Sequence, residues 1–322
     1  MGVLSVVVYN TRYMSEFFSI IVPIYNEAGN ITPLFEKIRA VMKPFSNWEV
    51  IFVNDGSYDE SDVELQRLCH TYPRVRVIEF VRNFGQTAAW AAGFDHAKGD
   101  YLITLDGDGQ NDPGDIPRMI ELMKKKQADV VTGWRKHRKD PFIRGLMSQV
   151  ANGLVNWLTG SHIRDTGCSL RILKKAVVEN LVLYGEMHRL LPFLLSGYGV
   201  RMIETPVHHH PRTIGKSKYG LSRMFKVVMD VIVVKFLVSY RTKPIYMFGS
   251  LGSVFLVLSG IFSVLVVVRK IAFGGEWISP IFFVMTNFFT IGVVLIMMGL
   301  MMEVQVRTWF EGTGKKSYEV KK

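Results

Sequence analysis

The sequence predicts a doubly wound α/β domain that is followed by a hairpin of two membrane-spanning helices. Over residues 18–206, short β-branched runs alternate with longer amphipathic stretches, as strands and helices do around a parallel sheet. Beyond residue 244 the chain holds two long apolar stretches without a charged residue. The polar motifs of the first part directly follow apolar runs, where ligands of such sheets bind.

The strands are predicted at five apolar runs, and Pro23 is expected to end the first of them. Helices are expected over residues 31–42, 60–71, 87–98 and 116–126, several of them beginning at Asp, Asn or Pro in capping positions. Because strands and helices alternate, the strands are expected to run parallel, with their carboxyl ends at one edge of the sheet. The five runs are SIIVPI, WEVIFVN, VRVIEFV, YLITLD and DVVTGW.

Two apolar stretches, residues 244–268 and 277–302, are each long enough to cross a hydrocarbon core of roughly 30 Å. The link between them, RKIAFGGE, is short, so both ends of the hairpin are expected on one side of the membrane. Basic residues on that side outnumber those of the link, which predicts that this side faces the cytoplasm. They are Arg241, Lys243, Arg307, Lys315, Lys316, Lys321 and Lys322, against Arg269 and Lys270 in the link.

The chain is expected to divide into five parts. The first segment is apolar but too short to span a bilayer, and Met14 is an alternative start. The segment before the hairpin spaces charged residues about one turn apart among apolar ones, which fits a helix in the membrane interface or an ordinary core helix. The parts are an N-terminal extension (1–15), the α/β domain (16–220), the juxtamembrane helix (221–243), the two transmembrane helices (244–302) and a basic tail (303–322).

Composition narrows the class of protein. With 48% hydrophobic residues, the chain is neither disordered nor fibrous. Its net charge of +11 calls for an anionic partner, which can be lipid, nucleotide phosphate or nucleic acid. The only cysteines, Cys69 and Cys168, lie far apart, so neither a disulfide framework nor a zinc site is predicted.

The motif LDGDGQ places Asp106 and Asp108 after an apolar strand. Two carboxylates separated by one residue can share Mg²⁺ or Mn²⁺ and leave other coordination positions for substrate phosphates. Aspartate and glycine are also common in plain turns, so the residues alone leave both interpretations open.

Two further strand ends carry acidic residues. In IFVNDGS, Asp55 could accept hydrogen bonds from a ribose or a base, or it could cap a helix together with Ser57. In SIIVPIYNE, Glu27 follows on the adjacent loop. Both positions fit a nucleotide pocket.

The stretch PRTIGKSKYG concentrates Arg212, Lys216 and Lys218. It suits a loop that closes over phosphates, and equally a basic patch on the membrane surface. The preceding residues 208–210 are three histidines. Because consecutive residues of a strand point to opposite faces, we expect structural or substrate-proximal histidines there rather than a metal site.

Taken in order, the motifs VPIYNE, NDGS, RNFGQ, LDGDGQ followed by NDP, DTGCSLR and HHHPRTIGKSKY resemble the polyprenyl-phosphate branch of the family 2 inverting glycosyltransferases. The resemblance covers nearly the whole chain. It implies a GT-A fold, with a Rossmann-like, mostly parallel sheet. It also implies sugar transfer from a UDP- or GDP-sugar to polyprenyl phosphate of the undecaprenyl type, and a multi-pass, homotetrameric protein of the bacterial inner membrane with its catalytic domain in the cytoplasm.

The resemblance also assigns roles to residues. Asp165 matches the proposed base, but the acceptor phosphate has a second pKa of about 6 and is largely ionised at neutral pH. We therefore expect Asp165 mainly to orient the acceptor or the metal. The family more often has D-A-D-L-Q where this chain has Gly107 and Gly109. The implied roles are nucleotide binding by Pro23, Tyr25, Glu27 and Asp55, metal binding by Asp106 and Asp108, a second contribution from Gln110, and contact with the lipid phosphate by Arg135, assisted by Arg138.

Two alternatives are weighed against this function. A processive polysaccharide synthase carries Q-x-x-R-W before a larger set of spans, whereas QVRTW here has another spacing and follows the last span. The second alternative is a nonenzymatic membrane subunit or a nucleic-acid binder. Neither would need the four intact carboxylates of Asp55, Asp106, Asp108 and Asp165, and the sequence contains no nucleic-acid motif. For the donor, the motifs look most similar to the aminoarabinose transferase group, and glucose, mannose and galacturonate stay open.

Overall fold

The computed structural model describes residues 16–135, residues 163–211 except 180, 182, 184, 186, 190, 197 and 198, residues 243–313 except 275, and positions 236 and 240. The chain divides into two compact units, Met1–Val234 and Lys235–Lys322. Several predictions lie outside the described residues: the extension with Met14, Arg138, the basic loop with Arg212, Lys216 and Lys218, nearly all of the juxtamembrane helix, and the tail beyond residue 313.

The first unit is built on a seven-stranded sheet with the order β3-β2-β1-β4-β6-β5-β7. Its neighbouring strands are parallel except at β6, which runs antiparallel to both β4 and β5. The mostly parallel sheet is therefore confirmed, with two strands more than the five predicted. The strands are β1 (Phe17–Ile24), β2 (Asn47–Asn54), β3 (Val75–Glu79), β4 (Tyr101–Thr104), β5 (Val130–Trp134), β6 (Arg171–Lys174) and β7 (Met202–Pro206).

The four predicted helices are confirmed to within two residues at each end. They are α1 (Ile31–Met42), α2 (Ser61–Thr71), α3 (Gln86–His96) and α4 (Ile116–Lys125), and shorter helices follow at η2 (Pro113–Asp115), α6 (Lys175–Val178), η3 (Met187–Arg189) and α7 (Leu191–Ser196). The expected capping is wrong at Asn30 and Asp115, whose side chains make no capping hydrogen bond. Each side chain has another partner: Asn30 donates to Glu27, three residues earlier in the chain, and Asp115 accepts from the distant His208.

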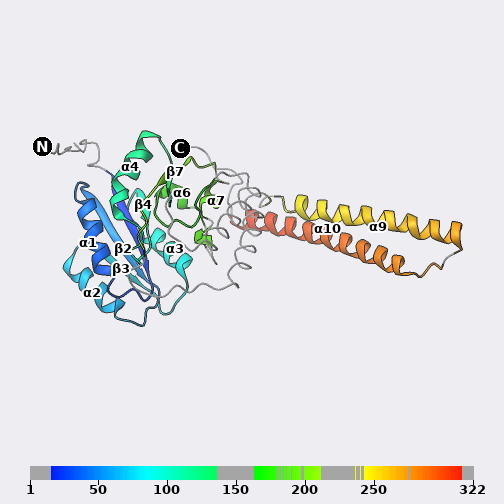
Figure 1. Ribbon diagram of the computed structural model, residues 1–322, viewed down its shortest axis with the longest axis horizontal. Helices are drawn as coiled ribbons and strands as arrows, with labels where there is room; N and C mark the ends of the chain where they lie inside the picture. Colours follow the sequence, from blue (N-terminus) through cyan, green and yellow to red (C-terminus); the bar gives the residue numbers. More distant parts are fainter. Residues whose placement is uncertain are drawn as a thin grey trace. The chain divides into compact units, whose positions relative to one another are not determined.

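Helices cover both faces of the sheet (Figure 1). Side chains of α1, α2 and α4 form one core with Val50 and Phe52 of β2, and side chains of α3, α6 and α7 form a second core with Ile51 and Val53. Successive residues of one strand thus alternate between two buried layers, which explains why the strand sequences are apolar throughout.

Pro23 does not end β1 as predicted. The strand continues through Ile24, and Pro23 is paired with Val53 of β2. On its other side β1 pairs with β4 only as far as Ile21. A proline, which lacks an N–H, is tolerated where the second neighbouring strand has already ended.

The second unit contains α9 (Ile245–Phe273) and α10 (Pro280–Thr313). Both are long and apolar enough to cross a membrane, with mean hydropathies of 2.6 and 2.3. Only 17% and 6% of their most apolar windows are buried, so most of their apolar surface is exposed in the described structure. The two helices approach closely at Gly252 and Gly292, where a Cβ on Gly252 would lie 2.7 Å from the Gly292 carbonyl oxygen. Small residues permit this contact between helices in lipid.

Replacing Gly252 with Val is expected to separate α9 from α10 and to destabilise the hairpin by about 1–3 kcal/mol, the usual cost of overpacking. Thermal unfolding in detergent, followed by circular dichroism, measures the effect. The matched control is Gly260→Val in the same helix, since a Cβ at Gly260 meets nothing within 4 Å. Equal destabilisation by both variants would show that the loss comes from helix propensity and not from packing.

Candidate active site

The carboxyl ends of β1, β2, β4 and β5 lie at one edge of the sheet. The strands β1, β2 and β4 are parallel to one another, and β5 runs in the same direction because both β4 and β5 are antiparallel to β6, which lies between them. The residues that precede β6 reach the same edge, since Arg171 at its start is paired with Thr104 at the end of β4. This edge therefore collects the loops that follow residues 24, 54, 104 and 134 and the loop that precedes residue 171.

Asp55, at the end of β2, is 3% exposed. Its carboxylate accepts hydrogen bonds from the backbone N–H groups of Phe84 (2.7 Å) and Gly85 (2.9 Å) and from the Asn83 side chain (2.9 Å). Burial raises the pKa of Asp55, and the Phe84 and Gly85 hydrogen bonds act against that rise. Asp55 thus holds the turn that leads into α3.

The loop after β1 is held in place by the loop after β2. The N–H groups of Asn26 and Glu27 donate to the hydroxyls of Ser57 and Ser61, each at 3.0 Å. Tyr25 is 37% exposed and meets the ring of Tyr58 edge to face. The predicted nucleotide-binding residues Tyr25, Glu27 and Asp55 therefore lie on two loops that are hydrogen-bonded to each other. The carboxylate of Asp55, however, accepts its hydrogen bonds from other residues of the protein.

The acidic loop, residues 106–112, follows β4 and carries Asp106 and Asp108. The Gln86 side chain donates to Asp106 Oδ1 at 2.6 Å. Burial raises the pKa of Asp106 to about 6, and repulsion from Asp108 adds to the rise. A Cβ on Gly107 would lie 2.5 Å from the Ile24 side chain and 2.9 Å from the Pro23 carbonyl oxygen, so glycine permits the loop to lie against β1.

Two carboxylates that repel each other at the end of a strand fit a divalent cation, whose charge would relieve that repulsion. Within the described ranges no three His, Cys, Asp or Glu side chains are grouped to hold a metal. Asp106 and Asp108 would therefore supply only part of a coordination sphere, as expected of a Mg²⁺ or Mn²⁺ site that is completed by water and substrate phosphates.

Across the edge, Asp165 and Arg135 form a bidentate pair. Arg135 donates from Nε to Asp165 Oδ2 at 2.7 Å and from Nη2 to Oδ1 at 2.8 Å. Asp165 also accepts from the backbone N–H groups of Arg135 and Gly167, each at 3.1 Å. Burial lowers the pKa of Arg135, but the hydrogen bonds and charge of Asp165 outweigh it and raise that pKa, so the guanidinium stays charged. Four donors occupy the Asp165 carboxylate.

Three residues that order this edge, Gln86, Ser169 and Glu204, had no role predicted from the sequence. Besides Gln86, Ser169 accepts from the Asn111 side chain at 2.6 Å, and Glu204 of β7 accepts from the N–H groups of Arg164 (2.9 Å) and Asp165 (3.3 Å). Of these three, only Glu204 stands out in the sequence, as a single acidic residue in an apolar run. Gln86 and Ser169 are uncharged polar residues inside the motifs, and nothing in the sequence distinguishes them from their neighbours.

Arg171 lies under the edge and is 1% exposed. Its guanidinium donates to the carbonyl oxygens of Thr166 (2.8 Å) and His188 (3.1 Å) and lies 5.3 Å from the centre of the Trp90 ring. Burial lowers the pKa of Arg171 to about 10, so the group is still a cation at neutral pH. It adds positive charge beneath Asp106 and Asp165.

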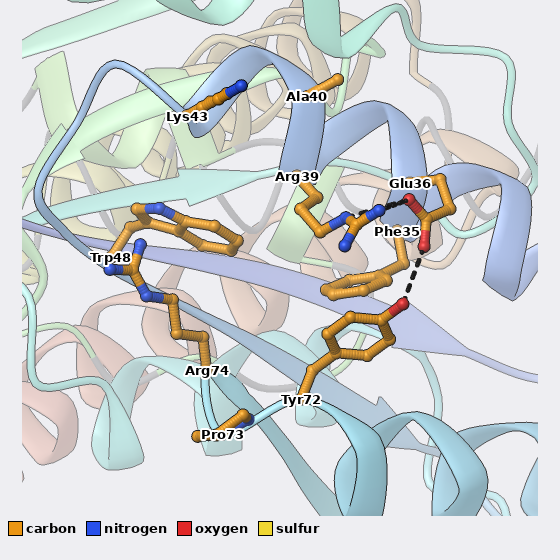
Figure 2. A pocket seen from close by; sticks show the side chains of 9 residues that line it. All are labelled: Phe35, Glu36, Arg39, Ala40, Lys43, Trp48, Tyr72, Pro73 and Arg74. Atoms are coloured by element: carbon orange, nitrogen blue, oxygen red, sulfur yellow. Dashed lines mark hydrogen bonds and ion pairs between the residues drawn. The ribbon is translucent and has the colours of Figure 1, made fainter.

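A groove of about 690 Å³ lies away from this edge, at the amino ends of β2 and β3 (Figure 2). Arg74 stacks on Trp48 with 4.9 Å between the guanidinium carbon and the ring centre. Glu36 forms an ion pair with Arg39 and accepts a hydrogen bond from the Tyr72 hydroxyl. None of the predicted site residues lines it, so this groove is not the candidate active site.

Two known proteins are similar to this chain over nearly its whole length. The chain is 37% identical to the dodecaprenyl-phosphate galacturonate synthase of Rhizobium johnstonii, over 97% of this chain and 94% of that protein. It is 33% identical to the undecaprenyl-phosphate 4-deoxy-4-formamido-L-arabinose transferase of Edwardsiella ictaluri, over 94% and 93% of the two chains.

Among solved structures, glucosyl-3-phosphoglycerate synthase of Mycobacterium tuberculosis matches with a TM-score of 0.54 and 14% identity, over 70% of this chain and 80% of that one. The same enzyme in complex with Mn²⁺ and UDP-glucose gives a TM-score of 0.52 at 15% identity, over 70% and 79%. These structures share the GT-A fold expected from the sequence. The family model described as glycosyl transferase family 2 matches residues 19–180. With that match and these relatives, the chain belongs to glycosyl transferase family 2.

Proposed function

We propose that this enzyme transfers a sugar from a nucleoside-diphosphate donor to the phosphate of an undecaprenyl-type lipid, with inversion at the anomeric carbon. One observation carries the proposal: a loop with two carboxylates and a charged arginine held by Asp165 lie at the same sheet edge, in a chain that also has two apolar helices. The relatives named above act on dodecaprenyl and undecaprenyl phosphate, which supports a lipid acceptor.

The donor side is assigned to the loops after β1, β2 and β4. Pro23, Tyr25 and Glu27 line the nucleotide, and Asp55 acts by fixing the turn that brings Gln86 to Asp106. Asp106 and Asp108, with a contribution from Gln110, would hold Mg²⁺ or Mn²⁺, whose positive charge would offset the charge on the departing diphosphate.

The acceptor side is assigned to Arg135. Its guanidinium keeps N–H donors beyond the two that bind Asp165, and these can grip a phosphate oxygen. The acceptor arrives largely ionised, because its second pKa is about 6. Its oxygen forms the new bond to the anomeric carbon while the bond to the diphosphate breaks, and no proton has to be removed. Asp165 therefore orients Arg135.

The proposal includes a location in a bacterial inner membrane, with both ends of the hairpin and the family 2 domain on the cytoplasmic side. The distribution of basic residues supports it. Arg138, Arg212, Lys216 and Lys218 are proposed to complete the binding of the phosphates and the lipid. The homo-oligomer implied by the resemblance belongs to the same proposal.

Detergent-purified protein with Mn²⁺, undecaprenyl phosphate and a panel of UDP- and GDP-sugars is expected to release nucleoside diphosphate and to form a sugar-phosphate lipid with one donor. UDP-galacturonate and the UDP-linked formamido-arabinose head the panel because of the two relatives. Asp108→Asn should lower the rate at least about 100-fold, since several kcal/mol of charge stabilisation depend on the metal. Mass spectrometry of the lipid fraction identifies the product.

Asp95→Asn, an exposed residue of α3, is the matched control and should leave the rate unchanged. Diphosphate release without a lipid product would indicate another acceptor. A wild-type protein that binds no donor across the panel would support the nonenzymatic alternative instead.

Asp165→Asn is expected to lower kcat/KM for the lipid acceptor about 100-fold, because Arg135 loses its charged partner. The remaining activity should keep the wild-type acid limb, with an apparent pKa of about 6 that belongs to the acceptor phosphate. A pH profile of kcat/KM for both proteins checks this. If the variant lost that limb, or lost all activity at every pH while still binding acceptor, Asp165 would be the base.

A further inference from the structure

The three histidines that follow β7 lie alongside the acidic loop. The His210 N–H donates to the Gln110 carbonyl oxygen at 2.8 Å, and the His210 ring Nε2 lies 3.0 Å from Asp112 Oδ2. Asn111 and His209 form an isolated antiparallel bridge between the same two segments. The motif thus meets the loop that carries Asp106 and Asp108.

His208 makes a second contact just beyond the loop. Its N–H donates to Asp115 Oδ2 at 2.6 Å, and its ring Nδ1 lies 3.2 Å from both Asp115 oxygens. Asp115 is 3% exposed and also accepts from Arg118 at 2.8 Å. His208 and His210 are two residues apart, so in extended backbone they point to the same side, which explains why both reach aspartates.

The acidic loop is loosely packed at Gly109. Gly109 has a φ of +71°, and a Cβ there would meet nothing within 4 Å. Glycine on each side of Asp108 leaves the backbone of that residue many accessible conformations. The loop is fastened before Asp108 by the contact of Asp106 with Gln86 and of Gly107 with β1, and after Gly109 by the contacts of Gln110, Asn111 and Asp112.

We propose that His208 and His210 are positioning residues that fix the far end of the acidic loop and thereby hold Asp108 and Gln110 ready for the metal and the donor diphosphate. This inference rests on the proposed function of that loop. The histidines donate to carboxylates, and no metal-binding group of three such side chains occurs in the described part of the chain. They act on the site through Asp112, Asp115 and Gln110.

The test compares His210→Ala with His210→Gln, whose side-chain amide can donate to Asp112 in place of Nε2. His210→Ala should raise amide hydrogen exchange of residues 108–112 in the metal-free protein about tenfold, the equivalent of one hydrogen bond of about 1.4 kcal/mol. It should also weaken binding of UDP in the presence of Mn²⁺ about threefold to tenfold, with little change in KM for the lipid. His210→Gln should restore both. His208→Ala should have a smaller effect on these residues, because the His208 ring contacts Asp115, which lies beyond residue 112.

His70→Ala, an exposed residue of α2, is the control for removal of a surface imidazole. The His210 side chain is 49% exposed, so the fold should survive its removal, and thermal unfolding verifies this for each variant. Unchanged exchange over residues 108–112 in His210→Ala, or equal loss in His210→Gln, would overturn the inference. Failure of the wild type to bind either UDP or GDP with Mn²⁺ would instead refute the proposed function, and the exchange data would still decide the role of the histidines.

Discussion

Buried carboxylates that must be satisfied by hydrogen bonds organise the whole carboxyl edge of this sheet. An unpaired buried carboxylate is very costly, so each one fixes whichever segment supplies its donors. Asp55 fixes the turn before α3, Asp165 fixes Arg135, and Asp115 fixes the start of the histidine segment, with exposed fractions of 3%, 6% and 3%. Asp106 and Asp108 differ, because the two carboxylates repel each other.

The proposed reaction requires both kinds of carboxylate, those that fix protein segments and the pair in the acidic loop. A nucleotide diphosphate and a lipid phosphate are both anions, and they must approach each other closely. In the proposed reaction, two positive centres would allow that approach: a cation at the acidic loop for the leaving group, and Arg135 for the acceptor. The buried Arg171 adds further positive charge beneath both. Loops fastened by internal carboxylates keep these centres in place without reorganisation during the reaction.

Much of this could be predicted from the sequence, because five strands are long apolar runs and their polar ends are distinct motifs. The strands β6 and β7 were missed because neither is a clear apolar run: in β6, RILK, only two apolar residues stand between charged ones, and Glu204 interrupts β7, MIETP. The prediction that Pro23 ends β1 was wrong because a strand can contain a proline where its neighbour has already ended, and the sequence does not show where β4 ends. The carboxylates of Asp55 and Asp165 were placed correctly at the edge, but their partners, Phe84, Gly85 and Arg135, are set by tertiary contacts that no local pattern encodes.

The separation of donor and acceptor sides can be measured directly with two single-methyl substitutions, Gly56→Ala and Gly167→Ala. A Cβ on Gly56 would lie 2.4 Å from the Arg82 backbone, in the turn held by Asp55, and one on Gly167 would lie 2.8 Å from the Arg135 guanidinium. KM values for donor and lipid, determined separately for both variants, should rise for the donor only in Gly56→Ala and for the lipid only in Gly167→Ala. If either variant raised the other KM, or both KM values rose together, the assignment of Asp106 and Arg135 to opposite substrates would be wrong.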